Sequence, residues 1–151
     1  MTDVRFPDEF NLADYWLFAR EREGRGAHPA IRFGDRAWSY AEVAARARAL
    51  AQALVAAGLR PEERVYVVLP DVPPFAWAIF ATLAAGGVVT MGNPATPAAD
   101  LATVIAYVKA SIVVTTPAVA DALAPHLGDA PRGGFVLTAD AATDEIGRAH
   151  V

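Results

Sequence analysis

Few residues of this chain of 151 could do chemistry, and they are scattered along it. Lysine occurs once, as Lys109, and no glycine loop precedes it, so it belongs to no phosphate-binding G-x-x-x-x-G-K-[ST] turn. The histidines His28, His126 and His150 lie far apart, without carboxylates at metal-ligand spacing. We therefore expect Lys109 to be a helix-dipole partner late in a helix, and we expect no metal site and no acid–base histidine.

Ser39 has the side chain of a nucleophile, but its neighbours indicate another role. Glu42 follows three residues later and completes the S-x-x-E pattern of a capping box, in which each side chain bonds the other residue's backbone N–H. We predict that Ser39 is a helix N-cap. A G-x-G-x-x-G dinucleotide turn is also absent from the sequence. No residue is therefore assigned a catalytic, cofactor-binding or metal-binding role.

Composition excludes several classes of protein. The chain has no cysteine, which rules out a disulfide framework and a thiolate metal site. Its formal net charge is -4, and its basic residues are spread over expected helices, so we expect no nucleic-acid partner. The polar residues 1–5 are typical of neither a signal peptide nor an anchor, which leads us to expect a cytoplasmic location.

A long stretch without charge, between Asp71 and Asp100, raises the question of a membrane span. A spanning helix needs about 20 consecutive apolar residues. This stretch is broken by Gly86 and Gly87 and again by Gly92 and Pro94. We predict no membrane span.

The same stretch organises the fold. Residues 65–70 and the run from Val88 onward predict two strands, continuously apolar, with a helix between them that has Asp71 as N-cap and Pro73-Pro74 in its first turn. Gly86-Gly87 ends that helix. The pattern predicts a parallel βαβ unit in which both faces of both strands are covered by helices.

Before this block we expect a helix, a hairpin and a second helix. Asn11 is the candidate N-cap of a helix whose packing side carries Leu12, Tyr15, Trp16 and Ala19. Residues 30–33 and 36–39 predict an antiparallel hairpin around Gly34-Asp35. The helix that starts at Ser39 and stops at Gly58 has one apolar stripe, made of Val43, Ala47, Leu50, Ala51, Leu54 and Val55.

After the block the alternation continues. Thr96 and Pro97 predict the N-cap and first residue of a helix that turns Leu101, Ile105 and Val108 inward, and residues 112–115 predict a strand. Thr116 and Pro117 repeat the start signal for a helix to about residue 127, and residues 135–138 predict a last strand. The fold class is α/β: a mostly parallel sheet with flanking helices, preceded by an N-terminal helix and a small β-hairpin.

Five short motifs follow one another in a set order. They are Trp38-Ser-Tyr-Ala-Glu-Val43, Gly58-Leu-Arg-Pro-Glu-Glu-Arg-Val65, Leu69-Pro-Asp71, Leu83-Ala-Ala-Gly-Gly-Val88 and Asn93-Pro-Ala-Thr-Pro97. Their order and spacing resemble the start of the adenylate-forming acyl- or aryl-CoA ligases, the AMP-binding superfamily. The opening Phe10-Asn-Leu-Ala-Asp-Tyr15 and Arg22-Glu-Gly-Arg-Gly26 are similar to the benzoate-CoA ligase branch, whereas Gly92-Asn-Pro94 is equally typical of coumarate-type ligases.

The resemblance implies that residues 1–144 are an incomplete N-terminal domain that serves as scaffold. In the longer parent enzyme, the carboxylate of the substrate would attack the α-phosphate of Mg-ATP to give an acyl-adenylate and pyrophosphate, and the thiol of CoA would then displace AMP. ATP, Mg2+ and CoA are thus implied for the parent, and none of them for this fragment. The phosphate loop, the acyl pocket and the catalytic lysine of the family would all lie downstream. Some relatives place a basic residue after the Asn-Pro pair, near the CoA phosphates, where this chain has Ala95.

Two other interpretations stay open. The chain could be a standalone α/β binding or regulatory module of the receiver or flavodoxin type, although a receiver would carry an acidic pair after its first strand, and only Asp71 follows here. It could also be a partial paralogue that binds a partner enzyme. The sequence does not tell which carboxylic acid the parent would activate.

The last residues prompt a prediction about their origin. Glu145-Ile-Gly-Arg-Ala-His-Val151 is what GAG ATC GGA AGA GCA CAC GTC encodes, and this string contains the start of a common sequencing-library adapter. We predict that residues 145–151 are a non-native read-through tail. Amplifying the locus from source DNA should show a different sequence after residue 144. An authentic stop codon directly after Val151 would refute the idea.

Overall fold

The computed structural model describes residues 7–128 and 131–137. The elements, in chain order, are the π-helix η1 (Asp14–Phe18), α1 (Ala19–Arg22), β1 (Pro29–Phe33), β2 (Arg36–Ser39), α2 (Tyr40–Ala56), β3 (Arg64–Val68), α3 (Pro73–Ala84), β4 (Val88–Met91), α4 (Ala98–Tyr107), β5 (Ala110–Thr115), α5 (Pro117–Leu127) and β6 (Phe135–Leu137). Strands and helices alternate from β3 onward, as predicted.

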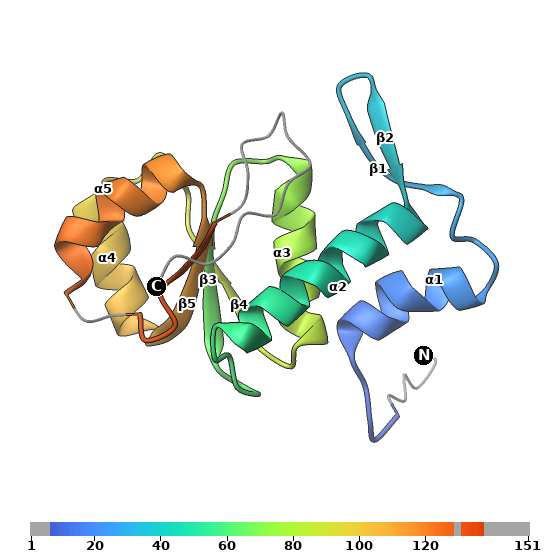
Figure 1. Ribbon diagram of the computed structural model, residues 1–151, viewed down its shortest axis with the longest axis horizontal. Coiled ribbons are helices and arrows are strands. Elements are labelled where there is room, and N and C mark those ends of the chain that lie inside the picture. The colour runs from blue at the N-terminus through green and yellow to red at the C-terminus, as the bar shows by residue number, and fades with distance from the viewer. Residues whose placement is uncertain (1–6, 129–130, 138–151) are drawn as a thin grey trace, which may run out of the picture.

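The last four strands form one parallel sheet in the order β4-β3-β5-β6. Helices α2 and α3 cover one face of this sheet, and α4 and α5 cover the other (Figure 1). The alternating side chains of β3 supply both cores: Val65 and Val67 pack with α2 and α3, while Tyr66 and Val68 pack with α4 and α5. The predicted α/β fold class is confirmed.

The two strands of the predicted βαβ unit are not equally buried. In β3 every residue after Arg64 is buried. In β4, by contrast, Val88 and Met91 are 44% and 58% exposed. The expectation that helices cover both faces of both strands is therefore wrong for β4, because β4 is an edge strand of the described sheet and only β3 pairs with it.

The N-terminal helix starts as predicted but faces the other way. The Asn11 side chain accepts hydrogen bonds from the backbone N–H groups of Ala13 and Asp14, at 2.9 and 3.2 Å, which confirms the cap. Asn11 Nδ2 also donates to the Leu83 carbonyl near the end of α3, at 2.7 Å. This bond fixes the start of the helix against α3, and Ala13 and Leu17 are the buried residues of the turns that follow.

Of the residues expected on the packing side, Leu12, Tyr15 and Trp16 are exposed, so that expectation was wrong. Spacing along a helix shows which residues share a side, but it does not show which side meets the core. The passage through the π-helix η1 was not predicted either.

The hairpin and the capping box are confirmed. Strands β1 and β2 pair antiparallel around Gly34, whose φ is 57°. Ser39 Oγ accepts from the Glu42 N–H at 3.3 Å, and the Ser39 N–H donates to the Glu42 carboxylate at 2.7 Å. In α2 the predicted stripe is buried at Val43, Ala47, Leu50 and Leu54, half-buried at Ala51 and exposed at its C-terminal end, Val55. Val55 lies about 100° around the helix from the buried Leu54 and so points past the core.

Three helix ends differ from the predictions in detail. The N-cap of α3 is Val72 and not Asp71, because the proline at the first helical position fixes the cap as the residue directly before it. Helix α4 has Pro97 as its N-cap, so Thr96 does not cap it. Lys109 lies just beyond α4, in a left-handed turn with φ 52°, instead of inside the helix.

The start and end of α5 agree with the sequence. Thr116 Oγ1 accepts from the Val119 N–H at 3.5 Å, Pro117 is the first residue, and Gly128 follows the last turn with φ 56°. Strand β6 takes up the predicted last strand as far as Leu137; residue 138 lies outside the described residues. Within residues 7–128 and 131–137, every helix is too short or too polar to cross a bilayer.

The capping box makes a prediction about stability. Replacing Ser39 with alanine removes the acceptor of the Glu42 N–H and should lower the free energy of unfolding by about 1 kcal/mol. Hydrogen bonds from Ser39, first from its backbone and then from its side chain, lower the pKa of Glu42 below its usual 4.5. The stabilisation from ionised Glu42 is therefore present above pH 4.5 and is lost as the pH falls through the lower folded-state pKa.

The Glu42→Gln variant should accordingly melt below the unmodified chain at pH 7, and the difference should shrink as the pH falls below 4.5. Thermal unfolding followed by circular dichroism at several pH values measures this. Glu62→Gln is the matched control, because the side chain of Glu62 is exposed and makes no bond within the described part of the chain. A difference that stays constant from pH 7 to pH 3 would contradict the assignment.

Candidate functional site

The carboxyl edge of the parallel sheet is where this kind of fold usually binds ligands. Helix α3 connects β3 to its neighbour β4 on one side, and α4 carries the chain back past β3 to β5 on the other. The chain therefore adds β4 on one side of β3 and β5 on the other. At such a switch point in the strand order, the loops leave a crevice at the carboxyl ends of β3 and β5. The Thr115 hydroxyl, at the end of β5, donates to the Val68 carbonyl, at the end of β3, at 2.8 Å. This buried bond holds the two strand ends together.

A hollow of about 470 Å³ lies at this edge, between the residues that follow β3 and β4. It is lined by Leu69, Pro70, Asp71, Phe75, Met91, Gly92, Asn93 and Pro94. Asp71 is the one charged residue among them, and its carboxylate faces no second acid or base from this lining. The described residues of this lining therefore include no pair of groups suited to acid–base chemistry and no cation to hold a phosphate.

The loop after β4 closes one side of the hollow. The Gly92 N–H donates to the Val67 carbonyl at 3.0 Å, and Asn93 Oδ1 accepts from the Ala95 N–H at 2.9 Å. The Ala95 N–H is thus already used within its own turn. Tyr66 lies beneath Gly92, and burial raises the pKa of the Tyr66 phenol. A methyl side chain at Gly92 would overlap the Tyr66 ring, with its carbon 2.8 Å from Cζ.

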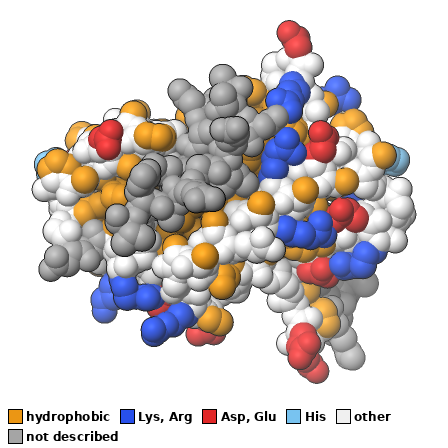
Figure 2. All heavy atoms as spheres, viewed as in Figure 1, with side chains coloured by type: hydrophobic (Ala, Val, Ile, Leu, Met, Phe, Trp, Pro, Cys, Tyr) orange, Lys and Arg blue, Asp and Glu red, His pale blue; other side chains and the backbone are white. Residues whose placement is uncertain are grey.

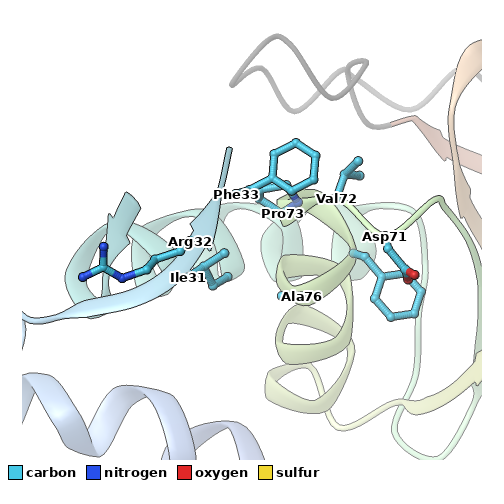
Figure 3. Close-up of a pocket in the computed structure, with 8 residues that line it drawn as sticks. Ile31, Arg32, Phe33, Asp71, Val72, Pro73 and Ala76 are labelled. Atoms are coloured by element: carbon cyan, nitrogen blue, oxygen red, sulfur yellow. The ribbon is translucent and has the colours of Figure 1, made fainter. Parts of the chain in front are cut away.

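A second hollow, of about 250 Å³, lies between the hairpin and the start of α3 (Figure 3). Its lining comes from Ile31, Arg32 and Phe33 of β1 and from Asp71, Val72, Pro73, Phe75 and Ala76 around the first turn of α3. Arg32 and Asp71, the two charged residues of this lining, lie on opposite sides of it in Figure 3. Asp71 and Phe75 line both hollows, so the two meet at the start of α3.

Helix N-termini at this edge would be the natural place for a phosphate, because their N–H groups point outward and their dipole favours anions. Helix α3 starts with two prolines, which have no N–H, and the Phe75 N–H is bonded to the Val72 carbonyl at 2.9 Å. Helix α4 has the carboxylate of Asp100 in its first turn. In α5, Pro117 has no N–H and the Val119 N–H is taken by Thr116. None of the three helix starts forms an anion cradle.

The residues weighed from the sequence do not come together here. Lys109 is exposed in the turn before β5, at the opposite, amino edge of the sheet. His28 is exposed ahead of β1, His126 is exposed near the end of α5, and His150 lies outside the described residues. Among the residues described, no three His, Cys, Asp or Glu side chains gather as a metal site. Ser39 is the helix cap that the sequence predicted.

Sequence reasoning missed the ion pair at the amino edge of the sheet. Arg132, in the turn before β6, donates to both carboxylate oxygens of Glu63 at 2.7 Å. The backbone N–H of Arg60, first, and the charge of Arg132 lower the pKa of Glu63. The two partners are 69 residues apart, and no motif connects them. Figure 2 shows basic and acidic side chains lying next to each other over α1 and α2 as well.

Comparison with known proteins identifies the family. A model of the AMP-binding enzyme family matches residues 18–149, and the chain belongs to this family. It is 35% identical over 109 residues to a feruloyl-CoA synthase of Amycolatopsis sp, which covers 72% of this chain and 22% of that protein. It is 38% identical over 97 residues to a salicyl-AMP ligase / salicyl-S-ArCP synthetase of Mycobacterium tuberculosis, covering 64% of this chain and 15% of that protein.

The fold comparison agrees. The crystal structure of a benzoate CoA ligase from Burkholderia xenovorans LB400 superposes with a TM-score of 0.76 at 27% sequence identity, over 87% of this chain and 26% of that one. The resemblance to adenylate-forming ligases is thus confirmed, and the match concerns their N-terminal portion. The chain spans 22% or less of the length of the curated relatives it matches, among them the synthetases of malpinin and triostin.

The contact between Gly92 and Tyr66 makes a testable prediction. Gly92→Ala should lower the free energy of unfolding by about 1–3 kcal/mol, because the new methyl group overlaps a buried ring. The same change in a Tyr66→Leu background should cost less, since the ring is gone. Gly26→Ala is the matched control, because the nearest atom to its new methyl group would be 3.6 Å away. Equal losses from Gly92→Ala in both backgrounds, measured by urea unfolding, would refute the contact.

Proposed function

We propose that this chain is the N-terminal scaffold portion of an ATP-dependent carboxylate–CoA ligase. Residues 1–144 are taken as the incomplete N-terminal domain and residues 145–151 as a non-native tail. The parent enzyme is an acid–thiol ligase that forms an acyl- or aryl-adenylate and then the CoA thioester. Family membership and the named relatives support the reaction class. With no cysteine for a disulfide, we keep the expectation of a cytoplasmic enzyme.

The observation that carries the scaffold proposal is that the starts of α3, α4 and α5, at the carboxyl edge of the sheet, do not form an anion cradle. Adenylation places new charge on phosphate oxygens, and stabilising it needs preorganised donors and a cation. Helix α3 starts with two prolines, and its Phe75 N–H is already hydrogen-bonded. Helix α4 has the carboxylate of Asp100 in its first turn. Helix α5 starts with Pro117, and the Thr116 side chain accepts from its Val119 N–H. The residues described thus do not fit ATP or Mg2+, and we assign no step of the reaction to them. Those donors belong to the rest of the parent.

Aromatic acids are the substrates that we propose first. Three relatives are named after aromatic acids: a feruloyl-CoA synthase, a salicyl-AMP ligase and a benzoate CoA ligase. The chain's own hollows do not decide the substrate. The salicyl-AMP relative is also named a salicyl-S-ArCP synthetase, so an acceptor other than CoA deserves a place in the assay.

The proposal predicts activity for the parent and none for the chain alone. The recovered parent should show ATP–pyrophosphate exchange that depends on a carboxylic acid, and AMP release that depends on CoA. Benzoate-like acids are the first substrates to test, and medium-chain acids are the second. The 151-residue chain should show neither under the same conditions, because its described residues form no phosphate cradle.

Two results would count against the proposal. Measurable exchange by the pure chain would overturn the scaffold assignment. A full-length protein that is inert toward every carboxylate, yet binds a partner protein, would favour the interaction-module alternative instead.

A further inference from the structure

Strand β4 has one open side. It pairs with β3 on the other, and the order β4-β3-β5-β6 places no further strand beside it among the described residues. The N–H groups of Val88 and Gly92 donate to carbonyls of the β3 segment, at 2.8 and 3.0 Å. Backbone groups point to alternate sides along a strand, so the N–H and C=O groups of Val89 and Met91 point to the open side.

This open side has little of the protection that sheet edges usually carry. Edge strands are commonly guarded by shortness, lysine, proline, charge, a bulge or a covering segment. With four residues β4 is short, but it contains no proline, it pairs with β3 without a bulge, and residues 72–99 carry no charge. Val88 and Met91 are 44% and 58% exposed, so no other described segment covers them.

Helix α3, which contacts β4, is also incompletely covered. Apart from the buried Thr82, it consists of apolar and aromatic residues. A helix that is apolar all round is normally buried on every side. Phe75, Ile79 and Leu83 share one side of α3 at a spacing of four residues, and all three are only half-buried. The helix and the strand that follows it thus both have the composition of interior elements.

We propose that β4 is an inner strand of the longer parent, in which an extended segment encoded beyond residue 144 pairs with its open side. This inference rests on the proposed function, because it needs a parent longer than the chain. The chain spans 26% of the benzoate CoA ligase with which it superposes, so most of such a protein is available to supply the added strand.

An extended segment fits this side of β4 because its backbone can bond the groups that point there. Val89 and Met91 together offer two N–H donors and two C=O acceptors, as in other cases of strand addition. These two residues pair with Val65 and Val67, whose side chains face α2 and α3. We therefore expect apolar side chains at alternate positions of the added strand, on the face that α3 covers.

A second copy of the chain is the weaker occupant. It would need the same N–H and C=O groups, and its pairing would depend on protein concentration. A segment of the same chain meets β4 at an effective concentration that the connecting chain sets and that does not fall on dilution. In the parent the connected segment therefore excludes the second copy.

The experiment compares amide hydrogen exchange in the recovered parent and in the 151-residue chain, read at single residues by mass spectrometry. In the chain alone, the amides of Val89 and Met91 should exchange at least about tenfold faster than that of Thr90, which points toward β3 and keeps its hydrogen bond. In the parent, the amides of Val89 and Met91 should be as slow as that of Thr90.

Two proline variants form a matched pair. Met91→Pro removes an N–H that points to the open side, where an edge strand accepts proline. It should lower the thermal midpoint of the parent more than that of the 151-residue chain. Thr90→Pro removes an N–H that points toward β3 and should destabilise both. If either variant fails to fold, the exchange rates of the two unmodified proteins still decide.

Val55→Lys is the remote control. Val55 is 56% exposed near the end of α2, and the nearby Gly58 carbonyl accepts from Arg132 at 3.4 Å, on the β6 side of the sheet. This variant should leave the exchange rates of Val89 and Met91 unchanged in both proteins.

Three results would overturn the proposal. Fast exchange of Val89 and Met91 in the parent would show that β4 remains an edge strand. Protection in the parent that disappears on dilution would assign the open side to a second copy. Equal losses of thermal midpoint from Met91→Pro in the chain and the parent would show that no strand is added there.

The pyrophosphate-exchange assay is read separately. A parent that activates carboxylic acids but leaves Val89 and Met91 unprotected contradicts this inference alone. A parent that protects them but activates no acid contradicts the proposed reaction alone.

Discussion

The rest of the structure depends on the burial of one strand, β3. Parallel strands pair with it on both edges, and helices cover both of its faces. Each fully buried aliphatic side chain of such a strand contributes about 1.5–3 kcal/mol. Its alternate residues belong to different cores, so a slip of the register by one residue would exchange the two sets and leave both cores mispacked. Hydroxyl groups on both neighbours reinforce the register, since Thr90 donates to the Val65 carbonyl and Thr115 to the Val68 carbonyl.

Local patterns in the sequence predict most of the elements around β3, because the interactions that form them span only a few residues. Ser39 and Glu42 are three residues apart, and Thr116 and Pro117 are adjacent, so their roles can be recognised without knowledge of the fold. The wrong details depend on distant contacts. The side of the N-terminal helix that faces the core is fixed by the bond from Asn11 to Leu83, 72 residues away. The exposure of β4 follows from its place at the edge of the described sheet.

The candidate site was predictable only as an absence of chemistry. Assigning no catalytic residue agrees with a carboxyl-edge hollow in which Asp71 is the one charged group among the described lining residues, though agreement of this kind does not test the assignment. The packing of Tyr66 beneath Gly92 has no signature in the sequence, because a glycine near the end of a strand usually indicates a turn or a bulge. The Glu63–Arg132 pair is similarly invisible until β6 lies beside β5.

The prolines at the carboxyl edge support the scaffold role that we propose for this portion of a fold that often binds nucleotides. In open parallel sheets the switch point attracts ligands because helix N-termini there supply N–H groups and positive potential. Prolines at the starts of α3 and α5 remove some of these donors, and the same rings restrict the backbone and so make both helix starts stiff. The same prolines thus weaken anion binding at these helix starts and hold the helix starts more firmly in position. A rigid edge whose described residues form no phosphate site suits this proposed role, in which the donors for adenylation arrive on other segments of a longer enzyme.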